Sequence, residues 1–307
     1  MDPMRLTRDQ HVYYFRSDAE PVLTVDPGTV LEIETWDCYQ GQVTSEAVTH
    51  EMIDLEFINP ATGPIAVRGA EPGDSLSVTL LDIRPESHGS AMCQPGWGQL
   101  GHHVQPATRI FHVEDGVITM NDSVRFAAQP MFGVIGVSPA SGAVHTLQAG
   151  QHGGNMDNND HGIGATVHLP VFQSGAMLGI GDMHASMGDG EICGTGVEIA
   201  GVGLVRVELI KATSGRWPVT ETPDSIITHG TSDGDISEAM QLACEEAERL
   251  LVDQWGFSPE DAFMFLSVAG DLGIAQYCHP CPGSVIAKMR IPRIEAVPRA
   301  FREDPRA

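Results

Sequence analysis

The chain has 307 residues, of which 41 are acidic and 17 are basic, so its formal net charge at pH 7 is −24. A negative field of this size disfavours nucleic acids and anionic membrane surfaces as partners, whereas a neutral small molecule would be indifferent to it. A chain of this length can bury a sizeable hydrophobic core without disulfide bonds.

The amino-terminal residues, MDPMRLTRDQHVYYF, lack the basic head and apolar run of a targeting segment. No later stretch approaches the roughly 20 apolar residues of a membrane-spanning helix. We therefore expect a soluble, cytoplasmic protein without a membrane partner. The six cysteines are scattered, and only Cys278 and Cys281 form a C-x-x-C pair, which we interpret as a loop with free thiols rather than as a metal or redox site.

The first third of the chain predicts short β-strands. Apolar runs within residues 12–33 are broken by a Pro-Gly turn, and residues 31–38 alternate apolar and polar side chains up to an acidic residue, Asp37. An aspartate at the end of a strand commonly caps the turn that follows. Residues 75–83 alternate in the same way, and residues 109–126 predict a hairpin turned at an Asp-Gly pair.

Three further segments, between residues 86 and 160, do not show the alternating pattern of these strands. Residues 86–106 are rich in Gly, Pro and His and have no period, which predicts a binding loop or lid. Residues 131–139 are almost continuously apolar, as in a strand buried on both faces. The glycines that follow permit close approach of a ligand to the backbone, Asn155 offers an amide and Asp157 a carboxylate. From the residues alone we interpret that segment as a glycine turn.

Four strands are expected in quick succession, at residues 165–173, 177–184, 191–199 and 203–210. Because their connections are short, we expect them to form a meander within one sheet. After Pro223 the pattern becomes helical. One amphipathic helix follows Asp235 and ends at Trp255, a second begins with Ser258 as its cap, and a last strand is expected at residues 285–291.

These elements predict a mostly β fold with antiparallel sheets arranged as a sandwich or barrel, followed by a C-terminal α+β portion that carries two helices. We expect residues 1–307 to form a single unit. It could divide into an N-terminal β subdomain, 1–140, and a C-terminal α+β subdomain, 141–307.

The most polar stretch of the expected meander is GIGDMHASMGDGEICGTGVE, residues 179–198. In a strand, Asp182 and His184 project to the same side, where a carboxylate and an imidazole could share one cation. The Asp-Gly turn after them should bring Glu191 and Cys193 back beside them. The residues alone leave two interpretations open, half of a metal site or a plain hairpin with a solvated polar face.

Several blocks of the chain together resemble the acetamidase/formamidase family, and they occur in the family's order over most of the sequence. The blocks are NPATGPIAVRGAEPGDSLSV (59–78), MFGVIGVSP (131–139), GQHGGNMDNND (150–160) and LPVFQSGAMLGIGD (169–182). The resemblance implies hydrolysis of a small aliphatic amide, such as formamide or acetamide, to a carboxylate and ammonia. One departure is Met187, where the family's usual pattern after the histidine has Gln.

The resemblance also implies a divalent metal ion at the site. We expect Asp182, His184 and Asp157 to hold it, with Glu198 as a further ligand or as a residue that orients the ligands. Zinc is the expected ion, and manganese and calcium remain alternatives for a mixed carboxylate and imidazole site.

Amide hydrolysis requires an activated water and a protonated leaving nitrogen. A divalent ion lowers the pKa of water and polarises the carbonyl group. We expect Glu191 to carry the proton from water to nitrogen, Asn155 to polarise the substrate as a donor, and Asp37 to be the acidic residue that the family has near the site. In a rival mechanism the Cys193 thiolate attacks the amide, but a cysteine within a strand is more often a small core residue.

Two other functions remain open. The chain could be a non-catalytic metal- or ligand-binding β protein of the same fold, or a hydrolase of a different small C–N substrate, such as a larger amide. We expect a small-molecule amide as the partner and a homo-oligomer, a dimer, with which edge strands and long loops are consistent.

Overall fold

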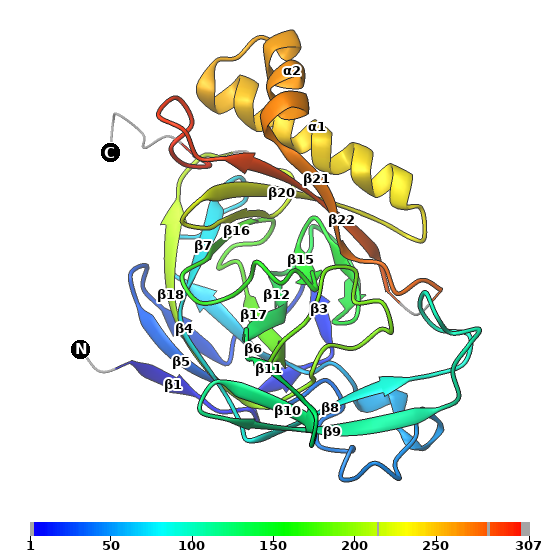
Figure 1. The fold of residues 1–307 in the computed structure, drawn as a ribbon. Helices are drawn as coiled ribbons and strands as arrows, with labels where there is room; N and C mark the ends of the chain where they lie inside the picture. Colours follow the sequence, from blue (N-terminus) through cyan, green and yellow to red (C-terminus); the bar gives the residue numbers. More distant parts are fainter. Residues whose placement is uncertain (1–2, 214, 281–282, 302–307) are drawn as a thin grey trace.

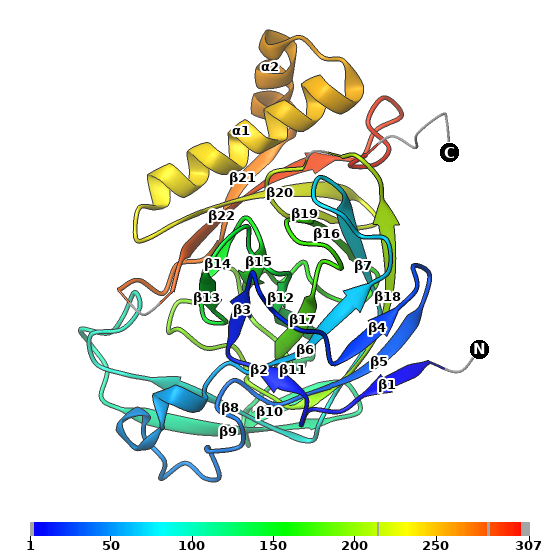
Figure 2. The same ribbon diagram turned by 180° about the vertical axis from the view of Figure 1, so that it is seen from behind.

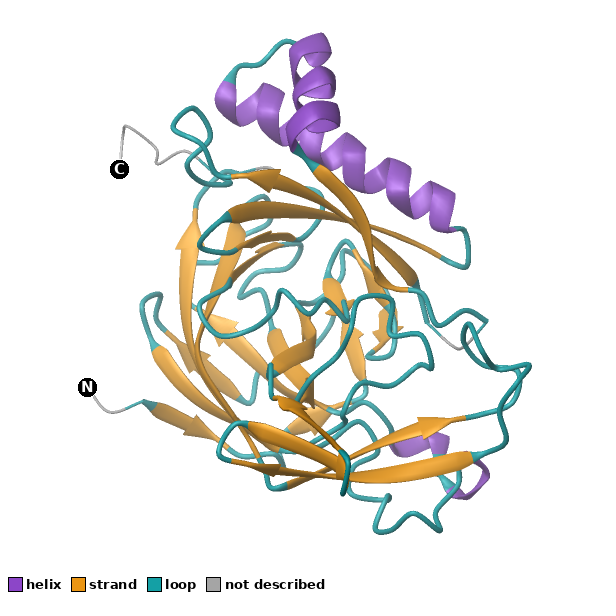
Figure 3. Ribbon diagram, viewed as in Figure 1, coloured by secondary structure: helices purple, strands orange, loops and turns teal. Residues whose placement is uncertain are grey.

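Two large β-sheets share one hydrophobic core (Figure 1). The computed structural model describes residues 3–213, 215–280 and 283–301. Strands dominate these residues, and two α-helices lie near the carboxyl terminus (Figure 3). The expected mostly β class with a C-terminal helical pair is confirmed. None of the described sheets closes into a barrel.

The larger sheet has nine strands, of which only the first pair is parallel. In spatial order they are β1 (Met4–Leu6), β5 (Val30–Thr35), β18 (Gly201–Ile210), β7 (Ser75–Pro85), β16 (Thr166–Pro170), β19 (Val219–Glu221), β20 (Ser225–Ser232), β22 (Val285–Pro292) and β21 (Asp271–Gln276).

The second sheet has seven strands and lies at the centre of the molecule. Its order is β14 (Ala149–Gly150), β15 (Gly153–Asn155), β12 (Met131–Gly136), β17 (Leu178–His184), β6 (Ala61–Val67) and β2 (His11–Val12), with β4 (Leu23–Val25) paired in parallel to β6. A four-stranded sheet has the order β11 (Val124–Ala127), β10 (Val117–Asn121), β9 (Ala107–Glu114) and β8 (His88–Cys93), and β3 (Tyr14–Arg16) pairs with β13 (Ala143–His145). The hairpin expected at residues 109–126 is the β9–β10 pair.

The main core lies between the two large sheets. Leu76, Val78 and Leu80 alternate along β7 and are fully buried, as their spacing predicts. They join Leu178 and Ile180 of β17 in one cluster of apolar side chains. Every residue of β12 is buried, which confirms the strand expected from its continuous apolar run. The seven-stranded sheet is therefore held with its central strands inside the protein.

The two helices begin and end as their capping residues predict. Helix α1 (Ile236–Trp255) starts where the Asp235 carboxylate accepts hydrogen bonds from two backbone amides, and it stops at Gly256 with φ of 72°. Helix α2 (Pro259–Ala269) starts at Ser258, whose hydroxyl accepts from the backbone of Asp261. Figure 2 shows α1 lying across β20 and β22, against which its alanine and leucine face is buried. None of the described helices is long and apolar enough to cross a membrane.

The meander expected within residues 165–210 is wrong. Strands β16 and β18 belong to the nine-stranded sheet, whereas β17 pairs with β12 and β6 in the other sheet. All seven residues of β17 are buried. The apolar surface that β17 buries between β12 and β6 decides which strands it pairs with, rather than its closeness in sequence to β16 and β18. The strand expected at 191–199 is also absent, because Glu191 and Gly194 have positive φ angles of 41° and 84°.

Two connections near the site are more ordered than the sequence suggested. The predicted loop at 86–106 begins with strand β8, so only its second part is a loop. The chain after β5 forms two short 3-10 helices, η1 (His50–Met52) and η2 (Leu55–Phe57). Strands from both sides of residue 140 share the two large sheets, and the division into subdomains stays a prediction.

Candidate active site

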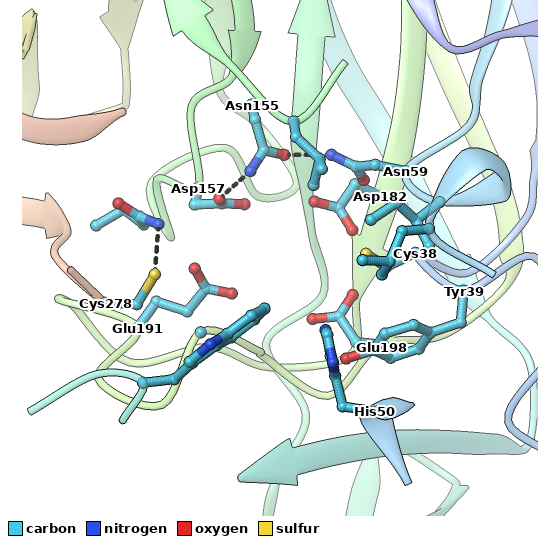
Figure 4. A pocket seen from close by; sticks show the side chains of 16 residues that line it. Cys38, Tyr39, His50, Asn59, Asn155, Asp157, Asp182, Glu191, Glu198 and Cys278 are labelled. Atoms are coloured by element: carbon cyan, nitrogen blue, oxygen red, sulfur yellow. Dashed lines mark hydrogen bonds between the residues drawn. The ribbon is translucent and has the colours of Figure 1, made fainter. Parts of the chain in front are cut away.

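Four acidic residues, labelled in Figure 4, meet His184 at the end of the central strand β17. Asp182 and His184 belong to β17, Asp157 follows β15, and Glu191 and Glu198 come from the loop between β17 and β18. Their exposed fractions lie between 1% and 7%. The structure therefore brings together the four expected metal ligands and the expected proton carrier in one buried cluster.

The backbone at this cluster is unusual. Asp157, Asp182 and Glu191 have φ angles of 35°, 53° and 41°, a region that residues other than glycine rarely adopt. Such conformations cost energy and tend to occur where a side chain must be aimed at a functional site. The strain at three of the clustered acids is consistent with a site that constrains their direction.

Two glycines make room for the cluster. A Cβ atom on Gly133 of β12 would lie 2.4 Å from Asp157 Oδ1 and 2.6 Å from Asp182 Oδ2. A Cβ on Gly196 would lie 2.5 Å from Nδ1 of His184. Only glycine fits at either position without displacing these side chains.

The contacts of His184 join the cluster. Its Nε2 atom lies 3.2 Å from Glu198 Oε2 and 3.4 Å from Asp182 Oδ1. The other Glu198 oxygen accepts a hydrogen bond of 2.9 Å from the backbone amide of Gly196. Asp182 and His184 therefore meet, as their spacing along the strand predicts.

A chain of amide side chains supports Asp157. Asn155 Nδ2 donates to Asp157 Oδ2 at 2.5 Å, and its Oδ1 accepts from Asn59 Nδ2 at 2.9 Å. Asn59 also donates to the carbonyl oxygen of Thr146 at 3.0 Å. Asn155 thus fixes the orientation of one carboxylate of the cluster. Asn59 was not identified from the sequence as a site residue.

Several polar atoms of the cluster lack a hydrogen-bond partner within the described residues. They are Asp157 Oδ1, Asp182 Oδ1, Glu198 Oε2 and both ring nitrogens of His184. His184 Nε2 lies at ion-pair distance from Asp182 Oδ1 and Glu198 Oε2 but makes no hydrogen bond of good geometry with either. Leaving one buried polar atom unpaired costs about 1–3 kcal/mol, so this arrangement favours a bound ligand. Two groups of side chains here have ligand atoms within 4.8 Å of one another: Cys38, Asp182 and Glu198 form one group, and Asp157, His184 and Glu191 form the other. The expected ligands Asp182, His184 and Asp157 are thus divided between the two groups, each of which has donor atoms of the kinds that bind divalent cations.

The electrostatics of the cluster disfavour uncompensated carboxylate charges. Burial, followed by the charge of Asp182, raises the pKa of Asp157 well above its usual value, and burial with Asp157 does the same for Glu191. Burial raises the pKa of Glu198 to about 7. Burial lowers the pKa of His184, but the charges of Glu198 and Asp182 outweigh it and raise that pKa well above its usual value. The buried negative charges require a bound proton or cation.

The cluster forms one wall of a cavity of about 280 Å³. Asn155 and all the clustered acids line it, together with Cys38, Tyr39 and His50 (Figure 4). Its apolar lining consists of Leu55, Ile58, Trp97 and Leu147. The predicted binding loop thus contributes Trp97, whose ring packs edge-on against that of His50 with centroids 4.5 Å apart. No period in the sequence marks these residues, because they come from irregular segments.

Asp37 occupies a different place from the other expected residues. Its two carboxylate oxygens accept hydrogen bonds from the backbone amides of Tyr39 and Gly41, at 2.8 and 2.9 Å. This is the turn-capping arrangement, and among the described residues the cavity lining contains Cys38 and Tyr39 rather than Asp37. A catalytic role for Asp37 stays a prediction. Cys38 was missed, although its neighbour was considered.

The rival nucleophile Cys193 is partly buried in a turn and not in the expected strand. Its sulfur lies 3.7 Å from the carbonyl oxygen of Thr195, and it is not one of the described residues that line the cavity. Met187 is 6% exposed and does not line the cavity either. The departure from the family pattern at Met187 thus lies outside the cavity wall.

The interpretation of Cys278 as a free thiol is wrong. Cys278 is disulfide-bonded, 3% exposed and part of the cavity lining. Gln276 Nε2 donates to its sulfur at 3.2 Å. The sequence alone did not reveal that Cys278 is bonded, because a disulfide depends on the distance between two positions in the folded chain. Cys281 lies outside the described residues.

Comparison with known proteins places this site in a family. The model of the acetamidase/formamidase family matches residues 2–145 and 140–293. An acetamidase of Mycolicibacterium smegmatis is 25% identical over 88% of each chain, and a formamidase of Methylophilus methylotrophus is 26% identical over 82% of this chain and 81% of its own. The crystal structure of an acetamidase from Bacillus halodurans has a TM-score of 0.90 and 34% identity, and the match covers 94% of this chain and 97% of that one. The chain belongs to the acetamidase/formamidase family, as its sequence blocks indicate.

Proposed function

We propose that this protein is a metal-dependent amidohydrolase that cleaves the C–N bond of small linear amides and releases a carboxylate and ammonia. The family and its acetamidase and formamidase relatives support amide hydrolysis. The observation that supports metal dependence is the convergence of unpaired buried carboxylate oxygens of Asp157, Asp182 and Glu198 on one cavity. His184 is not one of the lining residues, but its Nε2 atom lies within 3.4 Å of both Asp182 and Glu198.

Asp182, His184 and Asp157 are the proposed metal ligands, with Glu198 as a fourth ligand or as the residue that orients His184. Zinc suits imidazole and carboxylate ligands, and manganese or calcium are the alternatives that metal addition should distinguish. When bound, a divalent ion lowers the pKa of water and polarises the amide carbonyl.

Glu191 is the proposed proton carrier. A carboxylate oxygen takes a proton from water as the water oxygen bonds to the carbonyl carbon, and it delivers that proton to nitrogen as the C–N bond breaks. Burial raises the pKa of Glu191, which makes its carboxylate a stronger base toward water. Glu191 lines the cavity, so a substrate can reach it.

Asn155 is the proposed donor to the substrate. One of its two N–H bonds is directed to Asp157, and the second is the proposed hydrogen bond to the carbonyl oxygen. The same side chain therefore orients a metal ligand and polarises the substrate. The homo-oligomer stays a prediction.

The test is ammonia release from formamide and acetamide by the purified protein, before and after chelation and after addition of zinc, manganese or calcium. We expect chelator-sensitive release, with kcat for Glu191→Gln reduced about a hundredfold or more and its metal content unchanged. Glu114→Gln, an exposed residue on β9, is the matched control and should keep full activity. Release that survives metal removal, or no release with any of the three metals, would contradict the proposal.

A further inference from the structure

The cavity is larger than formamide or acetamide requires. A water molecule takes up about 30 Å³ of liquid volume, so a cavity of about 280 Å³ corresponds to roughly nine water molecules. Acetamide, with four non-hydrogen atoms, takes the space of about four waters. Space for several more non-hydrogen atoms therefore remains beside a metal ion and the reacting water.

The remaining wall is mainly apolar. Leu55 lies in η2, Ile58 follows it, Trp97 comes from the loop after β8, and Leu147 follows β13. An amide as small as formamide cannot cover all of these side chains, and apolar surface left in contact with water contributes nothing to binding. The wall therefore matches a hydrophobic group larger than a methyl.

The segment that carries Trp97 is packed against the segment that carries Glu191. The backbone amide of Gln99 donates to the carbonyl oxygen of Ile192 at 2.9 Å. A Cβ on Gly98 would lie 2.0 Å from that same oxygen, so the two segments are in close contact. The aromatic part of the wall is thus fixed beside the proposed proton carrier, where it can contact the substituent of an amide that reacts there.

The charge of the site restricts the substituent further. Four buried carboxyl groups line or adjoin the cavity, and the chain has a net charge of −24. The described lining residues include no Lys or Arg, so a substituent that carried a carboxylate would lose its hydration beside the apolar wall without gaining an ion pair there. A neutral apolar group can stack on Trp97 or pack against Leu55 without this penalty.

We infer that the cavity takes primary amides whose acyl group carries a branched alkyl or phenyl substituent, in preference to formamide and acetamide. This inference rests on the proposed amide hydrolysis and names its substrate class. The amide group would react at the acidic cluster, and the substituent would contact Leu55, Ile58, Trp97 and Leu147.

The first experiment compares kcat/KM for acetamide, isobutyramide and phenylacetamide, measured as ammonia release by the metal-loaded protein. Each buried methylene is worth about 0.8 kcal/mol, which is about fourfold in kcat/KM. We therefore expect isobutyramide, with two more carbons, to exceed acetamide by roughly tenfold and phenylacetamide to exceed acetamide as well. A fall in kcat/KM from acetamide to both larger amides would overturn the inference and leave the proposed hydrolysis intact.

The second experiment narrows the cavity. Leu55 lines the cavity and is 51% exposed, so it forms the outer part of the wall. Leu55→Trp adds bulk there and should lower the ratio of kcat/KM for phenylacetamide to that for acetamide by about tenfold or more. Met52→Trp is the matched control, because Met52 is a 67% exposed residue of η1 and does not belong to the described cavity lining. An unchanged ratio in Leu55→Trp would overturn the inference.

A binding measurement separates the inference from the proposed function. If the protein releases ammonia from none of the amides, calorimetry with phenylacetamide decides. Binding that Leu55→Trp weakens at least tenfold, and that Met52→Trp leaves unchanged, would support the apolar substituent site and overturn the hydrolysis. Absence of binding would overturn both.

Discussion

Gly133 lies on β12 opposite Asp182 of β17, between the two neighbouring pairs of the ladder. Replacing it with alanine adds a Cβ that would lie 2.4 Å from Asp157 Oδ1 and 2.6 Å from Asp182 Oδ2. Real Cβ atoms essentially never approach within 3.0 Å, so each carboxylate must retreat by about half an ångström. Metal–ligand distances tolerate only about 0.2 Å. Gly133→Ala should therefore disturb two ligands with a single methyl group.

The expected effect is large on the metal and small on the fold. Displaced ligands should weaken metal affinity by about 10–100-fold, and the misplaced site should lower kcat/KM by about a hundredfold. Metal affinity is measured by competition with a chelating dye, kcat/KM by ammonia release, and folding by thermal unfolding of the metal-free protein. Alanine itself favours a strand over glycine by about 0.5–1 kcal/mol, which should offset part of the strain.

Gly273→Ala is the matched control. Gly273 is also a strand glycine, on β21, and its added Cβ would meet only the Lys288 side chain at 4.0 Å. It should keep the metal affinity and kcat/KM of the original protein. If Gly133→Ala also keeps both, the carboxylates do not form a site of the kind described, and the reasoning is refuted.

Three further predictions concern the surroundings of the site. Lys288 is 4% exposed, and its ammonium group lies 3.0 Å from Asp160 and 2.6 Å from Asp189. It therefore links the segment that follows Asp157 to the segment that precedes Glu191. Lys288→Met should lower kcat about tenfold, and an unchanged kcat would contradict this. Burial lowers the pKa of His229 to about 4. Between pH 6.5 and 4 the His229 side chain binds a proton in the unfolded chain but not in the native state. The free energy of unfolding should therefore fall by about 3 kcal/mol as the pH falls through this range. In denaturant titrations, His229→Asn should reduce this dependence of the free energy of unfolding on pH, and an unchanged dependence would argue against the burial effect. Cys193→Ser should keep full kcat/KM for acetamide, and its loss would favour a thiolate mechanism.

Features that depend on neighbouring residues were predictable from the sequence. The alternation of Leu76, Val78 and Leu80 predicts which face of β7 is buried, and Asp235 and Ser258 mark the starts of the two helices. Side chains two apart on a strand share a face, which is why Asp182 and His184 were expected to meet. The family followed from the order of several blocks, which is more specific than any single motif.

Tertiary structure decided which strands pair and what lies beside the cluster. The sheet that β17 joins depends on burial between segments far apart in the sequence, so short connections misled the prediction of a meander. Cys38 and Trp97 enter the cavity from separate irregular segments, for which no period exists. The disulfide bond of Cys278 likewise depends on the distance between two folded positions. The sequence by itself therefore determined the local elements and identified most residues of the acidic cluster. Long-range packing alone decided which side chains form the apolar wall of the cavity, because burial between distant segments leaves no local pattern in the sequence.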